Sequence, residues 1–238
     1  MLAGIIALES NPVWGRQMLE WVWSQGHDPG EYRLIKTYLS AVRLPVQITP
    51  EIEIEEALGR SLVGLMIAEW KQSSGDPFGA LQIVEQLEPT SGVVLSLCDL
   101  YAQTESYDQI IELTDGLTNQ DDVTALLLVF RGQAFRQLGH NESARLVLTE
   151  ALRARSRASE IRFRALVERA LAYHADGKKG MARKDLDRIR AEDASYPGLA
   201  EAFTALGLDT VVPEPDQVAD ASVISPTTPI PLPPPHLR

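Results

Sequence analysis

The sequence is poor in the side chains that form cross-links and metal centres. Its 238 residues include one cysteine, Cys98, and four histidines, at positions 27, 140, 174 and 236. One cysteine excludes a disulfide framework and any zinc site built from a cysteine cluster, and the scattered histidines leave little from which to build another site. We therefore expect no metal site.

Basic residues are also scarce, with 22 Lys and Arg against 33 Asp and Glu and a formal net charge of −11. A general nucleic-acid binder neutralises phosphates with an excess of positive charge, so this composition argues against one. Any basic surface has to be local.

Long apolar runs are missing as well. The longest, such as residues 126–130, fall far short of the roughly 18 apolar residues that indicate a membrane span. The apolar stretch 1–8 has no Lys or Arg before it and no clear cleavage site, unlike a signal peptide. We expect a cytoplasmic protein that does not contact membranes.

Catalytic motifs are absent from the sequence. It has no glycine-rich phosphate loop, no histidine pair at metal-ligand spacing and no nucleophile elbow. Cys98 lies in the apolar segment VVLSLCDLY, where a small thiol favours packing over nucleophilic chemistry. We expect no catalytic residue, no cofactor and no enzymatic activity.

Proline is concentrated at the C-terminal end, where residues 208–238 hold eight of the fifteen prolines. Because proline cannot donate to a helix or sheet and large apolar side chains are few there, we predict a disordered tail. Its last stretch, 229–235, favours polyproline II and contains a Pro231-x-x-Pro234 match, a pattern that SH3-like domains recognise. A plain terminal tail is the alternative.

Residues 1–44 are predicted to form a helical hairpin. A capping side chain stands before a proline twice, at Asn11-Pro12 and at Asp28-Pro29. Apolar residues follow each pair at helical spacing, so we expect helices over 12–25 and 29–42 that pack together.

The tryptophans are concentrated before residue 71. Trp14 and Trp21 share one face of the first expected helix and are predicted to be core residues. Trp23 falls outside that stripe and is expected to be exposed, where it could mark an interface.

Residues 45–59 are predicted to be an extended connector. Val46, Ile48, Ile52 and Ile54 alternate with polar residues around Pro50, the period of a strand. A helix capped by Thr49 is the alternative.

Residues 60–207 repeat one pattern, and its two clearest copies have identical internal spacing at an offset of 38 residues. Each copy predicts a helix, a glycine turn and a second helix whose small residue faces the first. Weaker copies begin at Gly64 and Val94, and the latter has Glu105 at the turn. The two clear copies are Leu128, Gly132, Phe135, Gly139, Ala144, Leu148 and Ala151, and Leu166, Ala170, Tyr173, Gly177, Ala182, Leu186 and Ile189.

With this pattern, roughly residues 60–200 resemble the tetratricopeptide repeat (TPR) family, most clearly in GQAFRQLGHNESARLVLTEAL and RALAYHADGKKGMARKDLDRI. The chain departs from the family where Leu128 and Leu166 replace its early aromatic residue and Ser156 and Ala194 replace its closing proline. The resemblance implies an all-α fold, a right-handed superhelix of antiparallel helix pairs. It also implies a concave face, made by the first helices, that binds a peptide or protein.

Polar residues on the free faces of these first helices are the candidate partner-binding residues. They are Glu69, Gln72, Asp99, Gln103, Gln133, Arg136, Gln137, Arg164 and His174. The basic clamp with which some TPR proteins grip a peptide carboxylate is not matched, because its positions here include Leu95, Asp99, Phe130 and Glu168.

Charge is unevenly distributed along the chain. Residues 51–122 carry 15 acidic and 2 basic side chains, whereas 145–190 carry 13 basic and 6 acidic ones. The leading interpretation is a non-enzymatic scaffold that binds a protein or peptide. The alternative is association with nucleic acid or another polyanion through the Arg-rich segment 153–164. A third interpretation treats the chain as the repeat portion of a larger polypeptide.

Overall fold

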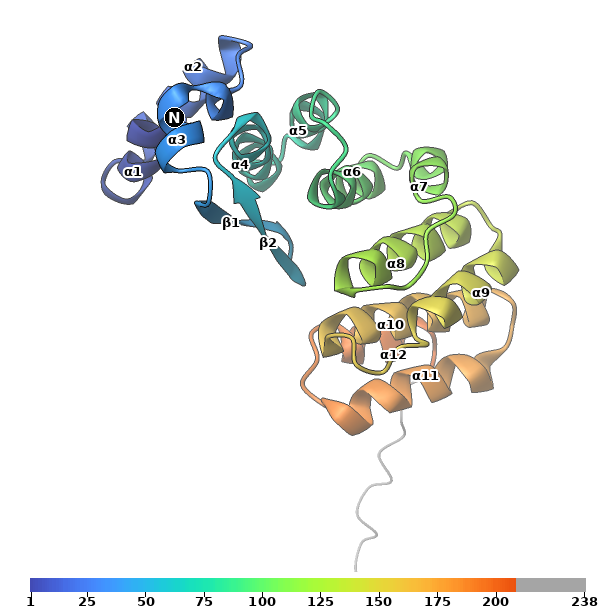
Figure 1. The fold of residues 1–238 in the computed structure, drawn as a ribbon. Helices are drawn as coiled ribbons and strands as arrows, with labels where there is room; N and C mark the ends of the chain where they lie inside the picture. Colours follow the sequence, from blue (N-terminus) through green and yellow to red (C-terminus); the bar gives the residue numbers. More distant parts are fainter. Residues whose placement is uncertain (209–238) are drawn as a thin grey trace, which may run out of the picture.

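In the computed structural model, which describes residues 1–208, helices follow one another in an arc with one β-hairpin on its inner side (Figure 1). The hairpin strands are β1 (Arg43–Thr49) and β2 (Ile52–Ala57). The helices are α1 (Leu2–Ser10), α2 (Pro12–Ser24), α3 (Arg33–Tyr38), α4 (Arg60–Ser73), α5 (Pro77–Val84), α6 (Ser91–Gln103), α7 (Tyr107–Leu113), α8 (Asp122–Gln137), α9 (Asn141–Ala151), α10 (Ser159–Ala175), α11 (Lys179–Glu192) and α12 (Leu199–Ala205).

The predicted repeat units are four successive helix pairs, from α4–α5 to α10–α11. Each pair turns where the sequence pattern places its turn residue. Gly75, Gly139 and Gly177 have φ angles of +84°, +82° and +71°, and Glu105 takes the same left-handed conformation at +58°. Glycine enters this region without the steric cost that a Cβ atom imposes. The spacing of the repeat, rather than the glycine itself, therefore fixes the turn.

Small residues bring the paired helices together, as the sequence predicts. A Cβ atom on Gly132 of α8 would lie 2.5 Å from Leu148 Cγ of α9, closer than two carbon atoms can approach. Ala144 and Ala182, at the equivalent positions of α9 and α11, are fully buried. One continuous core runs from the hairpin and α4 to α10, and a smaller core lies at each end of the array.

The partner of α2 differs from the predicted one. The Asn11 side chain caps α2 by accepting a hydrogen bond from the Trp14 N–H at 3.2 Å. The helix then packs against α1 because Gly4 and Gly15 allow close approach, and a Cβ atom on Gly15 would lie 2.9 Å from the Gly4 carbonyl oxygen. The predicted pairing of helices 12–25 and 29–42 is therefore wrong.

The second of those helices is interrupted. Residues Pro29–Glu31 form a 3₁₀ turn before α3, and the chain leaves α3 well before residue 42. One side-chain oxygen of Asp28 accepts hydrogen bonds from the N–H groups of Gly30 and Arg60, each at 2.8 Å. The expected cap thus ties this turn to the start of α4 instead of starting a long helix.

The tryptophans exchange their predicted roles. Trp14 and Trp21 are 44% and 58% exposed, so their assignment to the core is wrong. Trp23 is half-buried and packs between the N-terminal and main cores, with the Arg60 guanidinium 3.9 Å from its ring centroid. The buried face of α2 is the one that carries Gly15 and Leu19, one position away from the predicted stripe.

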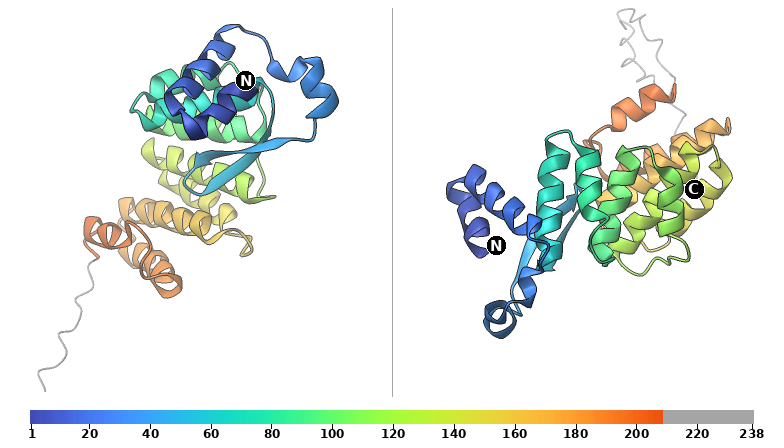
Figure 2. Two further views of the ribbon diagram at one scale, coloured as in Figure 1. Left: turned by 90° about the vertical axis from the view of Figure 1, so that its left-hand side faces the viewer. Right: turned by 90° about the horizontal axis from the view of Figure 1, so that it is seen from above.

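Residues 45–59 are extended, as predicted, and the helix capped by Thr49 is not formed. The two strands pair antiparallel across a turn at Pro50 and Glu51. Alternate residues Val46, Ile48 and Ile52 are buried against the array, and both views of Figure 2 show the hairpin alongside the helices. The fold is mostly helical, and this hairpin is the exception to an all-α description of residues 1–208.

The predicted tail, 208–238, lies outside the described residues except for its first member. Leu208 is 7% exposed and packs with Phe203 and Leu206 in the C-terminal core. Its place in the predicted tail is wrong, because the apolar end of α12 covers α10 and α11.

Candidate partner-binding surface

The hairpin tip bridges the array on its inner side. NH1 of Arg164 on α10 donates to both carboxylate oxygens of Glu51 at 3.1 and 3.2 Å, and the two residues are 113 positions apart in the sequence. The Arg164 guanidinium also lies 4.3 Å from the centroid of the Phe130 ring on α8. Both members of the ion pair are largely buried, so the tip is held in a fixed position against the fourth helix pair.

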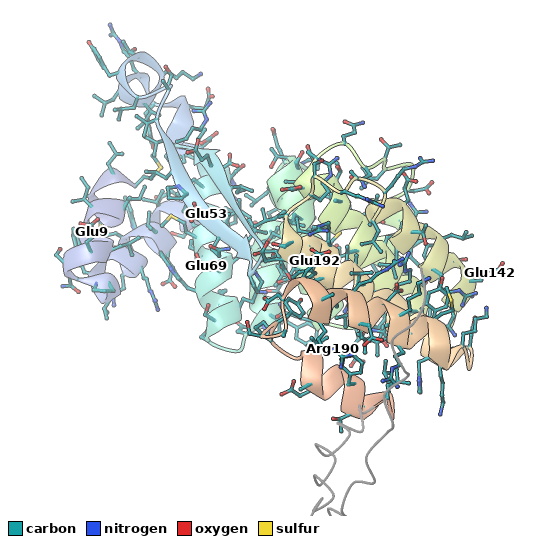
Figure 3. All side chains as sticks on the ribbon, turned by 90° about the horizontal axis from the view of Figure 1, so that it is seen from below. Glu9, Glu53, Glu69, Glu142, Arg190 and Glu192 are labelled. Carbon is teal, nitrogen blue, oxygen red and sulfur yellow. The ribbon has the colours of Figure 1, made fainter. Side chains whose placement is uncertain are left out.

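Close packing along the hairpin explains this placement. Ile54 on β2 packs onto Gly92 of α6, where the side chain occupies the space that a Cβ atom would fill. Glycine at this position therefore lets the hairpin lie flat on the first helix of the second pair. Figure 3 shows the hairpin running from Glu53 toward Glu192, away from α1 and α2.

Asp99 on α6 is the centre of a polar cluster beside the hairpin. Its Oδ2 accepts hydrogen bonds from the side-chain amides of Gln72 at 2.5 Å and Gln103 at 2.8 Å. Its Oδ1 accepts none from residues 1–208. Burial raises the pKa of Asp99 above its ordinary value, against the opposing hydrogen bond from Gln72.

Glu69 on α4 is the equivalent position one unit earlier. Burial raises the pKa of Glu69, and the charge of Arg16 acts in the opposite direction. The two carboxyl groups therefore occupy partly desolvated positions on successive first helices, where they could accept hydrogen bonds from a bound partner.

Five of the nine candidate residues meet at one open hollow of about 570 Å³. The hairpin supplies its other side through Gln47, Ile48, Pro50 and Glu51. The five candidates are Glu69, Gln72, Asp99, Gln103 and Arg164, and Ser73 lies with them. The first helices α4, α6 and α10 thus bring five of the candidates together, and none of the α8 candidates lines this hollow.

The tip also borders a second hollow, of about 480 Å³, on its far side. Phe163 and Tyr196, which contact edge to face with ring centroids 5.2 Å apart, line it together with Glu192. Pro50 and Glu51 belong to both hollows and separate them. The inner side of the array therefore offers two hollows divided by the hairpin. The first is lined mostly by polar residues and is called the polar hollow, and the second contains two aromatic rings.

The other four candidates do not reach the polar hollow. Arg136 donates through Nε to Glu168 at 2.8 Å, and both side chains are mostly buried. Gln137 is exposed near the end of α8. Gln133 Oε1 and His174 Nδ1 are buried and have no hydrogen-bond partner within residues 1–208. These four positions remain predictions.

The Arg-rich segment is largely neutralised by neighbouring residues. Arg153 pairs with Glu150, Arg162 with Glu192 and Arg164 with Glu51. Arg157 Nε donates to Asn119 Oδ1 and lies 4.0 Å from Asp122 Oδ1. Arg157, Arg162 and Arg164 hold separate segments of the chain together and are not free to form a run of phosphate contacts, whereas Arg153 is exposed and pairs within its own turn. This geometry does not favour the polyanion alternative.

Cys98 packs in the core beside this surface. It is fully buried, and burial, with the nearby Asp99 charge, raises the pKa of its thiol to about 12. A thiol in this state is a poor nucleophile. Within residues 1–208, no three His, Cys, Asp or Glu side chains gather as a metal site, and no helix has the length and apolar character of a membrane span.

Sequence reasoning missed the hairpin tip as part of the surface. Glu51 belongs to an acidic run that suits either a strand or a solvated helix face, and no local feature links it to Arg164. In the sequence, only their opposite charges indicate that Glu51 and Arg164 could pair. The curvature of the array brings the two residues together.

Comparison with known proteins supports the fold. No protein-family model matches the chain, and no curated protein matches its sequence. Among solved structures, it is similar to the N-terminal domain of the EccA1 ATPase from the ESX-1 secretion system of Mycobacterium tuberculosis. That likeness has a TM-score of 0.61 at 15% sequence identity and covers 83% of this chain and 75% of the other. It shows that the two share a mostly helical fold.

Proposed function

We propose that the chain is a non-enzymatic binding module whose TPR-like repeats form a right-handed superhelix and hold a protein or peptide against their inner side. The observation that carries the proposal is the polar hollow, in which residues of three first helices face the hairpin tip. Helical-repeat domains that bind partners present such inner surfaces. The solved neighbour, the N-terminal domain of a secretion-system ATPase, supports a protein-interaction role.

The chemistry of the hollow suits an extended peptide. The amides of Gln72 and Gln103 can donate and accept hydrogen bonds, and Asp99 Oδ1 is available to a peptide N–H or a basic side chain. The acidic excess of residues 51–122 favours a partner with positive charge, since complementary charge raises the rate of association. We therefore propose a basic segment as the ligand.

Blocking the hollow tests this function. Ser73 and Gln103 are exposed at its rim, so Ser73→Arg with Gln103→Arg fills it with bulk and positive charge while leaving the core intact. We expect partner capture from the producing cell to fall about tenfold or more, equivalent to about 1.4 kcal/mol of binding free energy. Quantitative pull-down with the purified chain measures it.

The matched control places two arginines elsewhere on the surface. Gln82 and Gln86 are exposed and line neither hollow, so Gln82→Arg with Gln86→Arg makes the same net charge change as the blocking variant. This control should capture the partner as the unmodified chain does. Equal capture by the blocking variant would count against the inner surface.

A further inference from the structure

The N-terminal helices carry an apolar groove that is separate from the hollows beside the hairpin tip. It has a volume of about 460 Å³ and lies between the start of α1, the end of α2 and the segment around α3. Its lining includes Trp21, Gln25, Pro29, Tyr32, Leu34 and Ile35. Trp21, Tyr32 and Leu34 are each more than half exposed, a concentration of bare apolar surface that marks an interaction site.

The groove has aromatic walls with unused hydrogen-bond donors. The Trp21 indole N–H and the Tyr32 hydroxyl donate to no group within residues 1–208. None of the lining residues is Asp, Glu, Lys or Arg. Grooves of this kind recognise polyproline II, because rings pack on the pyrrolidines while donors reach backbone carbonyls that this helix leaves free.

The chain itself contains a segment with the matching chemistry. Residues 226–235 read PTTPIPLPPP and carry no charged side chain, in a chain that is 23% charged. Proline has no backbone N–H, so the segment needs few hydrogen-bond acceptors from the surface that receives it. An uncharged segment rich in carbonyl acceptors thus complements a groove that offers indole and phenol donors and has no Asp, Glu, Lys or Arg side chain.

We propose that residues 226–235 of one copy bind the N-terminal groove of a second copy. Figures 1 and 2 place α1 to α3 at one end of the array and α12, which precedes the proline segment in sequence, at the other. A contact between opposite ends of two copies is head-to-tail and strengthens with protein concentration. This proposal is independent of the partner-binding surface and stands or falls separately from it.

A spin label on the proline segment tests the contact directly. In the full chain, His236→Cys supplies a thiol beside the segment, and buried Cys98 stays unlabelled because its thiol is inaccessible and its pKa is raised. Spin-labelled chain at natural isotope abundance is mixed with ¹⁵N-labelled chain that has no spin label. We expect the Trp21 indole N–H resonance of the ¹⁵N chain to lose intensity as the labelled chain is added.

Two variants separate this contact from random collision. In the labelled chain, Pro229→Ser, Pro231→Ser, Pro233→Ser and Pro234→Ser together should abolish the effect, and Tyr32→Ala in the ¹⁵N chain should also abolish it. Tyr38→Ala, at an exposed aromatic outside the groove, is the matched control and should preserve it. An unchanged Trp21 resonance in the mixed sample overturns the proposal. A second result also overturns it, namely an intensity loss that appears only when one chain carries both the spin label and ¹⁵N and that does not depend on protein concentration. Such a loss would show that the segment binds within its own copy.

Discussion

Arg169→Ala is expected to lower the free energy of unfolding by about 3–5 kcal/mol, the cost of leaving one member of a buried ion pair without its partner. The Arg169 guanidinium of α10 makes two parallel hydrogen bonds to Asp185 of α11, each 2.8 Å long. Its NH1 also donates to Thr149 of α9 at 3.1 Å. Arg169 and Asp185 are only 8% and 3% exposed. One side chain thus joins three helices. Its loss leaves the buried Asp185 carboxylate with only the longer 3.4 Å contact from Arg188.

The measurement is equilibrium unfolding in denaturant, followed by far-ultraviolet circular dichroism. Arg188 contacts the same carboxylate at 3.4 Å but is half-exposed, so Arg188→Ala should cost less than about 1 kcal/mol and serves as the control. The double replacement Arg169→Leu with Asp185→Leu should recover much of the loss, because it leaves no buried charge. A loss below 1 kcal/mol for Arg169→Ala would show that the pair is not buried as described.

Ala144→Leu is expected to destabilise the fold by about 1–3 kcal/mol through overpacking. Ala144 is fully buried on α9, one turn before Leu148, whose side chain already occupies the space beside Gly132. A larger side chain there has to push α8 and α9 apart or adopt a strained rotamer. For a domain of this size the melting temperature should fall by about 2–4 °C for each kcal/mol lost.

Ala191→Leu controls for the change in residue type. Ala191 is exposed in α11, so adding the same side chain there should change stability by no more than about 0.5 kcal/mol. Thermal melts of both variants compare the two sites directly. Equal melting temperatures for Ala144→Leu and the unmodified chain would contradict the close approach of α8 and α9.

The repeat region could be predicted from sequence because its determinants are local and recur. Gly139 and Gly177 follow their first helices by the same number of residues, and small residues recur at the helix contacts. Glu105 shows how strong this register is, since the chain makes the same left-handed turn there without glycine. Periodicity and turn chemistry were sufficient for these four helix pairs.

The N-terminal region could not be predicted in the same way, because tertiary contacts override its apolar pattern. Large residues such as Trp14 and Trp21 suggested the buried face of α2, but Gly4 and Gly15 determine which faces of α1 and α2 touch. Glycines do not contribute to a stripe of large apolar side chains, so that stripe does not predict a helix contact made through glycines. Two glycines eleven positions apart, in helices joined by Asn11, were the available indication.

The candidate surface was predicted in part for a related reason. Glu69 and Asp99 occupy equivalent positions of successive units, so the helical register alone places them in one column. The contribution of Glu51 depends on how strongly the array curves toward the hairpin, which no local pattern encodes. The repeat spacing predicts which side chains share one face of the array. It does not predict the position of an element, such as the hairpin, that crosses several repeats.

Site-specific photo-cross-linking in the producing cell tests the central claim most directly, namely that the inner surface holds the partner. A photoreactive phenylalanine analogue replaces Gln103 at the polar hollow, or Glu142, which Figure 3 places at the edge of the array farthest from the hairpin. The account predicts a discrete protein or peptide adduct from position 103 and none from position 142. An adduct from position 142 alone, or the absence of an adduct from position 103, would contradict it.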